Sequence, residues 1–142
     1  MSDLPTLLLI KETSKQLRLS FGEYFSDRDI RPLDAALLRH VYQEGCTTSG
    51  ELQEVIGMAK ATISDALNSL ANKGYIEYRP SASDRREKQS ILTKRGLEAN
   101  AYCQKVAEEF ETKILEGVDS DKEQIVRDVL KQILLNLGKG NP

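Results

Sequence analysis

The sequence predicts a mainly α-helical protein that contains one small β-hairpin. Apolar residues recur with helical spacing over most of the chain, including the segments before residue 26 and after residue 94. Two helical patterns lie close together between residues 48 and 74, and a glycine turn separates them. After residue 74 the period changes from 3.6 to 2, as expected for strands. The expected order is therefore a central helix pair and hairpin, with helices on both sides.

Length and composition indicate one globular domain. The chain has 142 residues, of which 39% are hydrophobic and 30% are charged, as is usual for soluble proteins. No apolar run approaches the roughly 20 residues of a membrane span. The run from Leu7 to Ile10 is too short for a signal-peptide core, and no basic residue precedes it. We therefore expect a cytoplasmic protein.

The N-terminal segment predicts a helix over residues 2–26. The i, i+4, i+7, i+8 spacing of a buried helical face is found at Leu17, Phe21, Tyr24 and Phe25. Leu7–Ile10, by contrast, is apolar on all sides for a full turn, so it must be covered from more than one direction. Either a second subunit or another part of the same subunit would cover it.

A second helix is expected to begin at Pro32, because proline suits the first helical position, and to end before Gly45. Its buried face is formed by Ala35, Leu37, Leu38, Val41 and Tyr42. Cys46 and Thr47 are candidates for a short strand beside the later hairpin.

The first helix of the central pair has its own start signal. Thr48 and Glu51 have the spacing of a capping box, which places the helix start at Thr48. Gly57 allows a tight turn at its end, and Met58 is expected to pack beneath that turn. A second helix then begins near Lys60. Helix, short glycine turn and helix form the helix-turn-helix pattern.

The helix expected from Lys60 ends at Gly74, the residue type favoured just beyond a helix end. Its buried stripe consists of Ile63, Ala66, Leu67, Leu70 and Ala71. The opposite side carries short residues, most of them polar: Ala61, Asp65, Asn68 and Asn72, flanked by Thr62, Ser64 and Ser69. Short side chains let a helix backbone approach another surface, and the DNA major groove, about 12 Å wide, admits one α-helix.

The hairpin is expected to consist of strands at Tyr75–Arg79 and Gln89–Leu92, because β-branched and aromatic residues alternate there with polar ones. The polar loop between them, Pro80–Lys88, is longer than a tight turn needs. Long loops of this kind are more often functional than incidental. Its basic residues are Arg85, Arg86 and Lys88, with Arg79 at its base.

Two helices are expected after the hairpin. Thr93 would cap the first, residues 94–116, which spans roughly 35 Å at 1.5 Å per residue. Ser120 and Glu123 have capping-box spacing and predict the start of the second. The apolar face of the second helix is too wide for one neighbour: Ile125, Val126, Val129, Leu130, Ile133, Leu134, Leu135 and Leu137. Together with Leu7–Ile10, this surface indicates a homodimer.

Charge is distributed unevenly along the chain. Residues 59–95 hold eight basic and four acidic residues, a net charge of +4. The whole chain has a net charge of −2, which leaves −6 on the remainder. A basic patch on an acidic body is the electrostatic footprint of a protein that binds a polyanion.

No metal, cofactor or catalytic set is predicted. The only histidine is His40, and Cys46 and Cys103 lie far apart without a CxxC motif, whereas a structural zinc site needs about four ligands. We expect two buried thiols, with redox sensing as the alternative. The sequence has no glycine-rich phosphate loop and no acid pair beside a nucleophile, so we expect no enzyme.

The chain resembles the MarR family of winged helix-turn-helix transcriptional regulators. The resemblance is carried by Glu51–Gly57 (ELQEVIG), Ala59–Ser64 (AKATIS), Leu70–Ile76 (LANKGYI) and Ser83–Gly96 (SDRREKQSILTKRG). Its most specific residues are Asp84, Arg86, Leu92, Thr93 and Gly96. It implies one domain over residues 1–142, with a winged helix-turn-helix core at 32–93. Residues 1–31 and 94–142 would form a helical dimerisation region.

The resemblance implies a regulator, a repressor or an activator with the repressor favoured, that binds double-stranded DNA as a homodimer. Two-fold symmetry then predicts a pseudo-palindromic operator. It also implies release by a small phenolic or other aromatic effector bound between the dimer helices and the DNA-reading part. The candidate effector-binding residues are Tyr24, His40, Tyr42 and Tyr102, and each of them also suits an ordinary core or surface position.

The predicted DNA-binding residues of the second central helix are Lys60, Ala61, Thr62, Ser64, Asp65, Asn68 and Lys73. Asn68 can pair bidentately with adenine, and Ala61 can meet a thymine methyl group. The two lysines would contact phosphates, which positions the helix without reading sequence. Asp65 stands where the resemblance predicts a basic residue. It would either accept a hydrogen bond from cytosine or repel phosphate.

The predicted DNA-binding residues of the wing are Asp84, Arg85, Arg86 and Lys88. The resemblance favours Arg86 at the tip, with Asp84 holding its guanidinium group. A narrow A·T-rich minor groove concentrates negative potential and attracts arginine. The alternative for this loop is a solvated charged loop without a role in binding. The alternative for the whole protein is a winged-helix interaction module that does not bind DNA.

Overall fold

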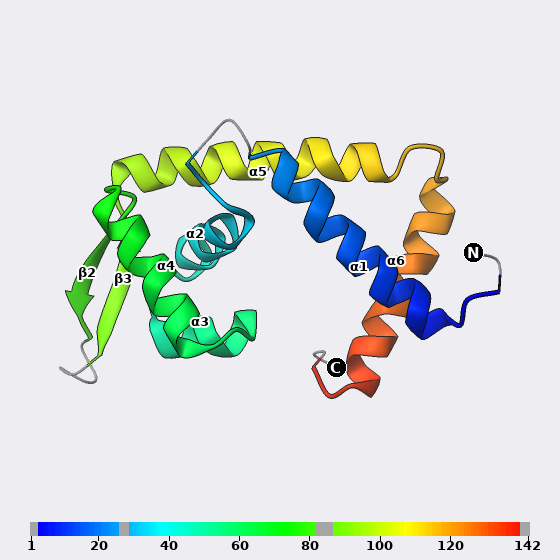
Figure 1. Cartoon of the computed structure of the whole chain (residues 1–142), viewed down its shortest axis with the longest axis horizontal. Coiled ribbons are helices and arrows are strands. Elements are labelled where there is room, and N and C mark those ends of the chain that lie inside the picture. Colours follow the sequence, from blue (N-terminus) through cyan, green and yellow to red (C-terminus); the bar gives the residue numbers. More distant parts are fainter. Residues whose placement is uncertain (1–2, 26–28, 82–86, 140–142) are drawn as a thin grey trace. The chain divides into compact units, whose positions relative to one another are not determined.

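The computed structural model describes residues 3–25, 29–81 and 87–139 (Figure 1). Over these residues six helices and three strands follow one another: α1 (Thr6–Glu23), α2 (Pro32–Glu44), β1 (Thr47–Thr48), α3 (Ser49–Ile56), α4 (Lys60–Asn72), β2 (Ile76–Pro80), β3 (Lys88–Leu92), α5 (Lys94–Ile114) and α6 (Ser120–Asn136). The predicted mainly α fold with a helix-turn-helix and a hairpin is confirmed. The chain forms two compact units, Met1–Ala107 and Glu108–Pro142.

The three strands form one antiparallel sheet in the order β1-β3-β2. Ile76 pairs with Leu92 and Pro80 with Lys88, which sets the register of the hairpin. The third strand predicted from the sequence is present as β1, where Thr47 pairs with Ser90. The sheet therefore joins the residues that precede α3 to the strand that precedes α5.

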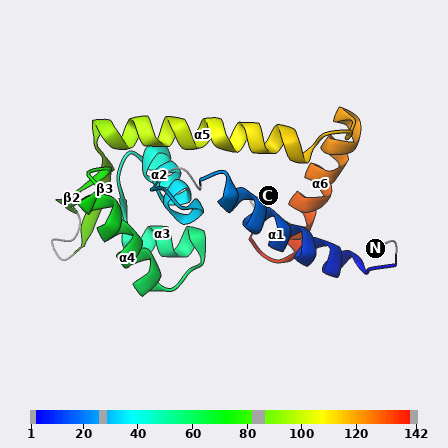
Figure 2. The same cartoon turned by 45° about the horizontal axis from the view of Figure 1, so that its top comes forward.

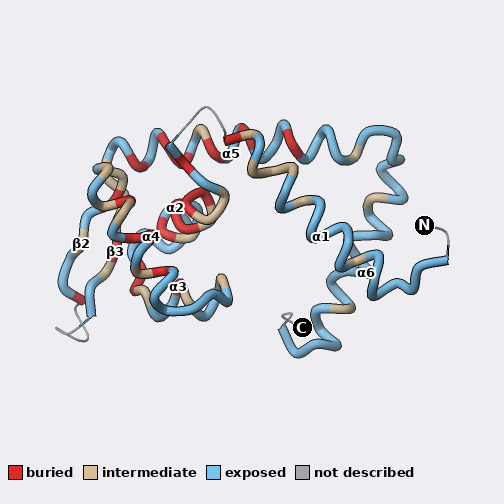
Figure 3. Tube along the Cα trace, in the orientation of Figure 1, coloured by how far each residue is buried: buried red, intermediate tan, exposed pale blue. Residues whose placement is uncertain are grey.

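The core of the first unit is built from the buried faces of α2, α3, α4 and the first part of α5, together with Ile76 of β2 (Figure 3). Its fully buried large residues are Leu37, Leu38, Val41, Leu52, Ile63, Leu67 and Leu70. Most of them belong to the stripes that helical spacing predicts. The periodicity of α2 and α4 therefore identified most of the core. Tyr42 is a correction, because it was predicted on the buried face of α2 and is 52% exposed.

Two of the three predicted helix caps are confirmed by their hydrogen bonds. The Thr48 hydroxyl accepts from the Glu51 backbone N–H at 3.2 Å at the start of α3. The Thr93 hydroxyl accepts from the Gly96 N–H at 3.0 Å at the start of α5. Both side chains therefore satisfy a backbone donor that the first helical turn leaves without a helical partner.

The capping box predicted at Ser120 and Glu123 is wrong. Asp119 is the N-cap of α6, and its side chain makes no capping hydrogen bond. The Glu123 N–H donates to the Asp119 carbonyl at 2.9 Å, which is the first helical bond. Ser120 is therefore already inside the helix and is not in the extended conformation of a cap.

Three other expectations need correction. Met58 does not pack beneath the turn after α3 but is 45% exposed. Cys103 is buried as predicted, whereas Cys46, between α2 and β1, is exposed. The N-terminal helix is shorter than predicted, because the Tyr24 N–H bonds to the Phe21 carbonyl three residues earlier and tightens the last turn.

Tyr75 lies outside β2, although alternation placed it in the first strand. Its N–H donates to the Leu70 carbonyl at 2.9 Å, and the Gly74 N–H donates to the Ala71 carbonyl. Gly74 has a φ of +82°. These bonds form a Schellman-type end to α4, so the backbone donor of Tyr75 completes the helix.

Each unit exposes large apolar residues. In the first unit they include Leu4, Leu7, Leu8, Leu9 and Leu19, in and just before α1. In the second unit they are Ile114, Val118, Ile125, Val126, Val129, Leu130, Leu134, Leu135 and Leu137. The uncovered apolar surface predicted from the sequence is therefore present in both. Within the described ranges, no helix is long and apolar enough to cross a membrane.

The end of α4, the start of β2 and the start of α5 meet at one point. The Thr93 N–H donates to the Tyr75 carbonyl at 3.1 Å, and the Thr93 hydroxyl donates to the Gly74 carbonyl at 2.6 Å. A Cβ at Gly96 would lie 1.9 Å from the Tyr75 carbonyl oxygen. Only glycine therefore permits this approach between α5 and the hairpin.

Gly96→Ala should lower the free energy of unfolding by about 1–3 kcal/mol, because the new methyl group would overlap a backbone atom. The matched control is Gly50→Ala in α3, where a Cβ would come no closer than 3.9 Å to the Thr48 hydroxyl. That control should raise the free energy of unfolding by up to about 1 kcal/mol. Urea denaturation followed by circular dichroism measures both, and equal stabilities would contradict the prediction.

Candidate nucleic-acid interface

The two faces of α4 differ as the sequence predicted. Ile63, Ala66, Leu67 and Leu70 are buried. The opposite face is made of the exposed Ala61, Thr62, Asp65, Asn68 and Asn72, with Ser64 and Ser69 half-buried at its edges. No long side chain rises from the middle of this face. Figure 2 shows α4 beside the hairpin, so this face of short side chains lies next to strands that carry the exposed Arg79 and Lys88.

The N-terminal end of α4 is also open. The helix begins at Lys60 after an N-cap at Ala59, without a capping hydrogen bond from a side chain. Residues 57–62 are all exposed. Gly57 has a φ of +77°, which ends α3 and turns the chain towards α4. The first backbone N–H groups of a helix carry partial positive charge, which favours an anion at this end.

Asn68 in the exposed face is tied to the hairpin through Tyr78. The Tyr78 hydroxyl donates to the Asn68 carboxamide oxygen Oδ1 at 2.6 Å. Burial raises the pKa of the Tyr78 hydroxyl above its ordinary value. The Lys88 ammonium nitrogen lies 5.2 Å from the centroid of the Tyr78 ring, within the range of a cation–π contact. Three elements, α4, β2 and β3, therefore meet at this tyrosine.

Sequence reasoning missed Tyr78, although a signal was present. Side chains alternate across a strand, so Tyr78 lies on the same face of β2 as the buried Ile76. That face is directed at the core, and Tyr78 packs against its edge. The alternation therefore pointed Tyr78 towards α4, but only the folded arrangement identifies Asn68 as its partner.

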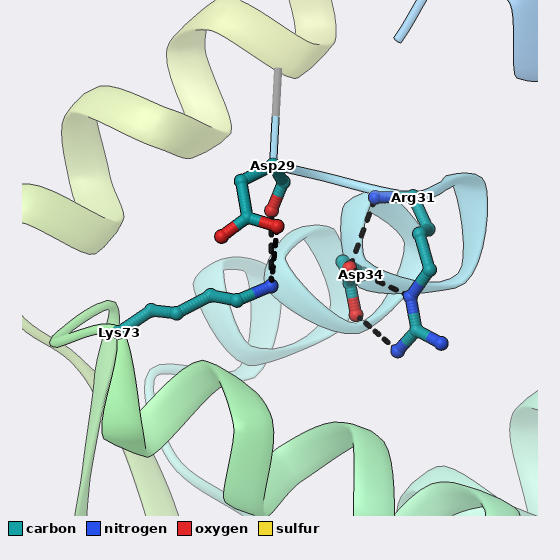
Figure 4. A network of polar contacts seen from close by, with 4 residues as sticks. All are labelled: Asp29, Arg31, Asp34 and Lys73. Carbon is teal, nitrogen blue, oxygen red and sulfur yellow. Dashed lines mark hydrogen bonds and ion pairs between the residues drawn. The ribbon is translucent and has the colours of Figure 1, made fainter. Parts of the chain in front are cut away.

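Lys73, just beyond the end of α4, is paired within the protein (Figure 4). Its ammonium nitrogen lies 3.1 Å from the Asp29 carboxylate oxygen Oδ1 and donates to the Asp29 backbone carbonyl at 3.1 Å. The ion pair is largely solvent-exposed on the Asp29 side, so it contributes little stability. It holds the C-terminal end of α4 against the segment that precedes α2.

A second ion pair orders the start of α2 (Figure 4). Asp34 is fully buried and its Oδ2 accepts from the Arg31 backbone N–H at 2.9 Å. The same carboxylate accepts from Arg31 Nε and Nη2, each at 3.2 Å. These side-chain hydrogen bonds and the Asp34 charge raise the pKa of Arg31. The Asp29–Arg31 segment is therefore held at both of its ends, by Lys73 at Asp29 and by Asp34 at Arg31.

Further basic side chains lie at the start of α4, in the hairpin and at the start of α5. Lys60, Arg79, Lys88, Lys94 and Arg95 are exposed, and the Arg95 guanidinium carbon lies 4.8 Å from the Tyr75 ring centroid. The predicted wing residues Asp84, Arg85 and Arg86 lie outside the described residues. Their roles stay predictions.

The four candidate effector residues do not line one cavity together. One cavity of about 390 Å³ is lined by Val41, Tyr42, Gly45, Arg79, Ile91, Leu92 and Leu97. A second, of about 220 Å³, is lined by Ile30, Tyr75, Arg95, Glu98, Ala99 and Tyr102. Tyr42 and Tyr102 thus belong to different cavities, and Tyr24 and His40 line neither. In the part of the chain that the structure describes, no cluster of His, Cys, Asp or Glu is arranged to hold a metal ion.

Comparison with known proteins identifies relatives along most of the chain. The model of the MarR family matches residues 31–88. The multiple antibiotic resistance protein MarR of Salmonella typhimurium is 27% identical over 128 residues, covering 89% of this chain and 88% of the relative. The multiple antibiotic resistance protein MarR of Escherichia coli K12 is 24% identical over 132 residues, with 92% of each chain covered.

Solved structures share the fold. A mutant MarR from E. coli complexed with operator DNA superposes with a TM-score of 0.82 at 23% identity, over 92% of this chain and 94% of that one. A MarR transcriptional regulator from Methanosarcina mazei Go1 gives a TM-score of 0.81 at 20% identity, over 90% and 92% of the two chains. The winged-helix architecture is therefore the one found in these regulators.

The bond between Asn68 and Tyr78 should appear as a coupling energy. In a double-mutant cycle of Asn68→Ala and Tyr78→Phe, we expect about 0.5–1 kcal/mol of coupling in the free energy of unfolding, because Asn68 is exposed and water competes for the bond. Urea denaturation of the four proteins gives the value. The control cycle pairs Tyr78→Phe with Asn72→Ala, one turn further along α4, and should show no coupling. Equal coupling in both cycles would argue against the bond.

Proposed function

We propose that this chain is a MarR-family transcriptional regulator that binds double-stranded DNA sequence-specifically, as a homodimer, and represses transcription. The observation that carries the proposal is the exposed face of α4, formed by short polar residues beside a basic hairpin. A solvated helix more often carries long charged side chains. A face of short residues suits close contact with base edges in the major groove.

In this proposal α4 enters the major groove with its N-terminal end leading. Lys60 and the open N–H groups of the first turn contact phosphate, and this positions the helix. Ala61, Thr62, Ser64 and Asp65 then face base edges or the flanking phosphates. Lys73 is already paired with Asp29, so it reaches a phosphate only if that exposed pair opens. Its first role is to hold the helix end.

The hairpin acts as a wing beside the same groove. Lys88 is exposed at the start of β3 and contacts the phosphate backbone. Arg85 and Arg86 reach the minor groove, where negative potential attracts arginine, and Asp84 orients Arg86. The segment from residue 59 to residue 95 carries +4 on a chain of −2, which favours approach of DNA from this side.

A second copy of the chain covers the exposed apolar residues of α1 and α6. Exposed apolar residues in such number are unusual for a monomer and typical of an interface. Residues 1–31 and 94–142 would form this dimerisation region, which leaves 32–93 to read DNA. Two-fold symmetry then presents two α4 helices to a pseudo-palindromic operator with half-sites about one helical turn apart.

A small aromatic effector would regulate binding by preferring a dimer geometry unsuited to DNA. The cavities beside Tyr42 and Tyr102 each contain an arginine and apolar residues. That combination suits an aromatic acid. Tyr24 and His40 would contribute only from outside these two cavities.

The direct test is selection of genomic DNA fragments on the purified protein, followed by sequencing and gel shift of the retained fragments. The expected result is a shared inverted repeat. If no fragment is retained at moderate salt, the chain acts as a winged-helix interaction module and the proposal fails.

Arg86→Ala should weaken operator binding by roughly 1–3 kcal/mol, because a minor-groove contact and one phosphate-neutralising charge are lost. Fluorescence anisotropy with the selected operator, at several salt concentrations, measures the loss. Arg127→Ala in α6 removes the same charge outside residues 59–95 and serves as the matched control. Unchanged affinity in Arg86→Ala would refute the role of the wing.

Light scattering at micromolar concentration should give the mass of two chains. Leu130→Glu in the exposed apolar face of α6 should shift the protein towards monomer, because burial of a charge in an apolar interface is costly. Lys131→Glu, the neighbouring position, is the control and should remain dimeric. A monomeric parent protein would exclude the homodimer.

A further inference from the structure

The carboxamide of Asn68 is held in one orientation by the hairpin. Its oxygen accepts the Tyr78 hydroxyl at 2.6 Å, within the range of strong O–H···O hydrogen bonds. The oxygen of Asn68 is therefore directed at β2. Its NH₂ group is the part of the side chain that remains for a partner outside the protein.

Tyr78 is itself fixed in place. It occupies the centre of the β2–β3 pairing, opposite Ser90, and its ring packs against the core. The Lys88 ammonium group lies near the ring. Burial raises the pKa of the phenol above its ordinary value, so the hydroxyl stays protonated and remains a donor at neutral pH. A rigid donor therefore faces the Asn68 oxygen.

This orientation changes what Asn68 can read. An asparagine carboxamide has one acceptor oxygen and an NH₂ group with two donors. Bidentate pairing with adenine needs both, because adenine offers an acceptor at N7 and a donor at N6. The oxygen keeps a second lone pair, but the Tyr78 bond directs it at β2, so Asn68 presents its NH₂ group to a partner outside the protein. Donors match guanine, which has acceptors at O6 and N7, and thymine, which has one at O4. Adenine also has an acceptor at N7, but its N6 amino donor lies beside it and would meet a second donor instead of an acceptor.

We infer that Asn68 and Tyr78 act as one unit that selects guanine or thymine, rather than adenine or cytosine, at one position of each half-site. The inference rests on the proposed DNA binding, and it replaces the adenine pairing expected from the sequence. Tyr78 is then a positioning residue that determines specificity without touching DNA. Phe at position 78 would leave the carboxamide free to turn, so adenine would become acceptable.

The test is selection from a randomised duplex library with the full-length protein and three variants. Asn68→Ala identifies the operator position that Asn68 reads, because the base preference there should disappear. The parent protein should favour guanine or thymine at that position by roughly tenfold, the discrimination typical of one base contact. Tyr78→Phe should bind the same half-sites but shift that position towards adenine. Tyr75→Phe removes a hydroxyl from the neighbouring tyrosine and should select like the parent.

The outcomes separate the two proposals. If the parent protein selects an inverted repeat but prefers adenine or cytosine at the Asn68 position, the inference fails and DNA binding stands. An unchanged preference in Tyr78→Phe also overturns it, as does an Asn68→Ala variant that selects like the parent. If the parent protein retains no sequence, both proposals fail.

A second variant covers the case in which Tyr78→Phe does not fold. Asn68→Asp keeps an oxygen acceptor for Tyr78 but has no NH₂ group to donate to a base. It should fold like the parent and lose the guanine or thymine preference. If Asn68→Asp retains that preference, the NH₂ group is not the reading atom and the inference is overturned.

Discussion

The close approach of Gly96 to the Tyr75 carbonyl is the constraint on which the rest of this structure depends. A Cβ at position 96 would lie 1.9 Å from that oxygen. Thr93 bonds the Gly74 carbonyl and caps α5 through Gly96. The end of α4, both strands of the hairpin and the start of α5 are thereby joined at one place. The exposed face of α4 and the basic strands lie side by side for this reason.

α4 is held by contacts that leave its polar face open. Its apolar stripe packs in the core, the Lys73–Asp29 pair holds its C-terminal end, and the Asn68–Tyr78 bond ties its middle to β2. These contacts come from three directions. They limit rotation of the helix about its axis, which matters because a rotation would move every reading side chain to another base edge. Precision in the proposed readout therefore comes from residues that lie beside the reading face.

Polar and apolar surface are separated along the chain. Net positive charge is concentrated between residues 59 and 95, which carry +4 on a chain of −2, whereas most of the exposed large apolar residues lie in or next to α1 and α6. The first kind of surface attracts a polyanion over a distance set by salt screening, and the second kind acts only at contact. The proposed function, DNA binding by a dimer, uses both kinds of surface in different parts of the chain.

The sequence by itself determined the order of the helices, the caps at Thr48 and Thr93, and the two faces of α4. All of these depend on residues within one or two helical turns, so periodicity and capping patterns reveal them. Only the tertiary structure decided that Lys73 meets Asp29, that Asn68 meets Tyr78, and that Cys46 and Met58 are exposed. Those outcomes depend on which faces pack together between segments far apart in the chain, and local sequence does not determine that packing. The orientation of the Asn68 carboxamide, and with it the base it is inferred to read, belongs to this second class.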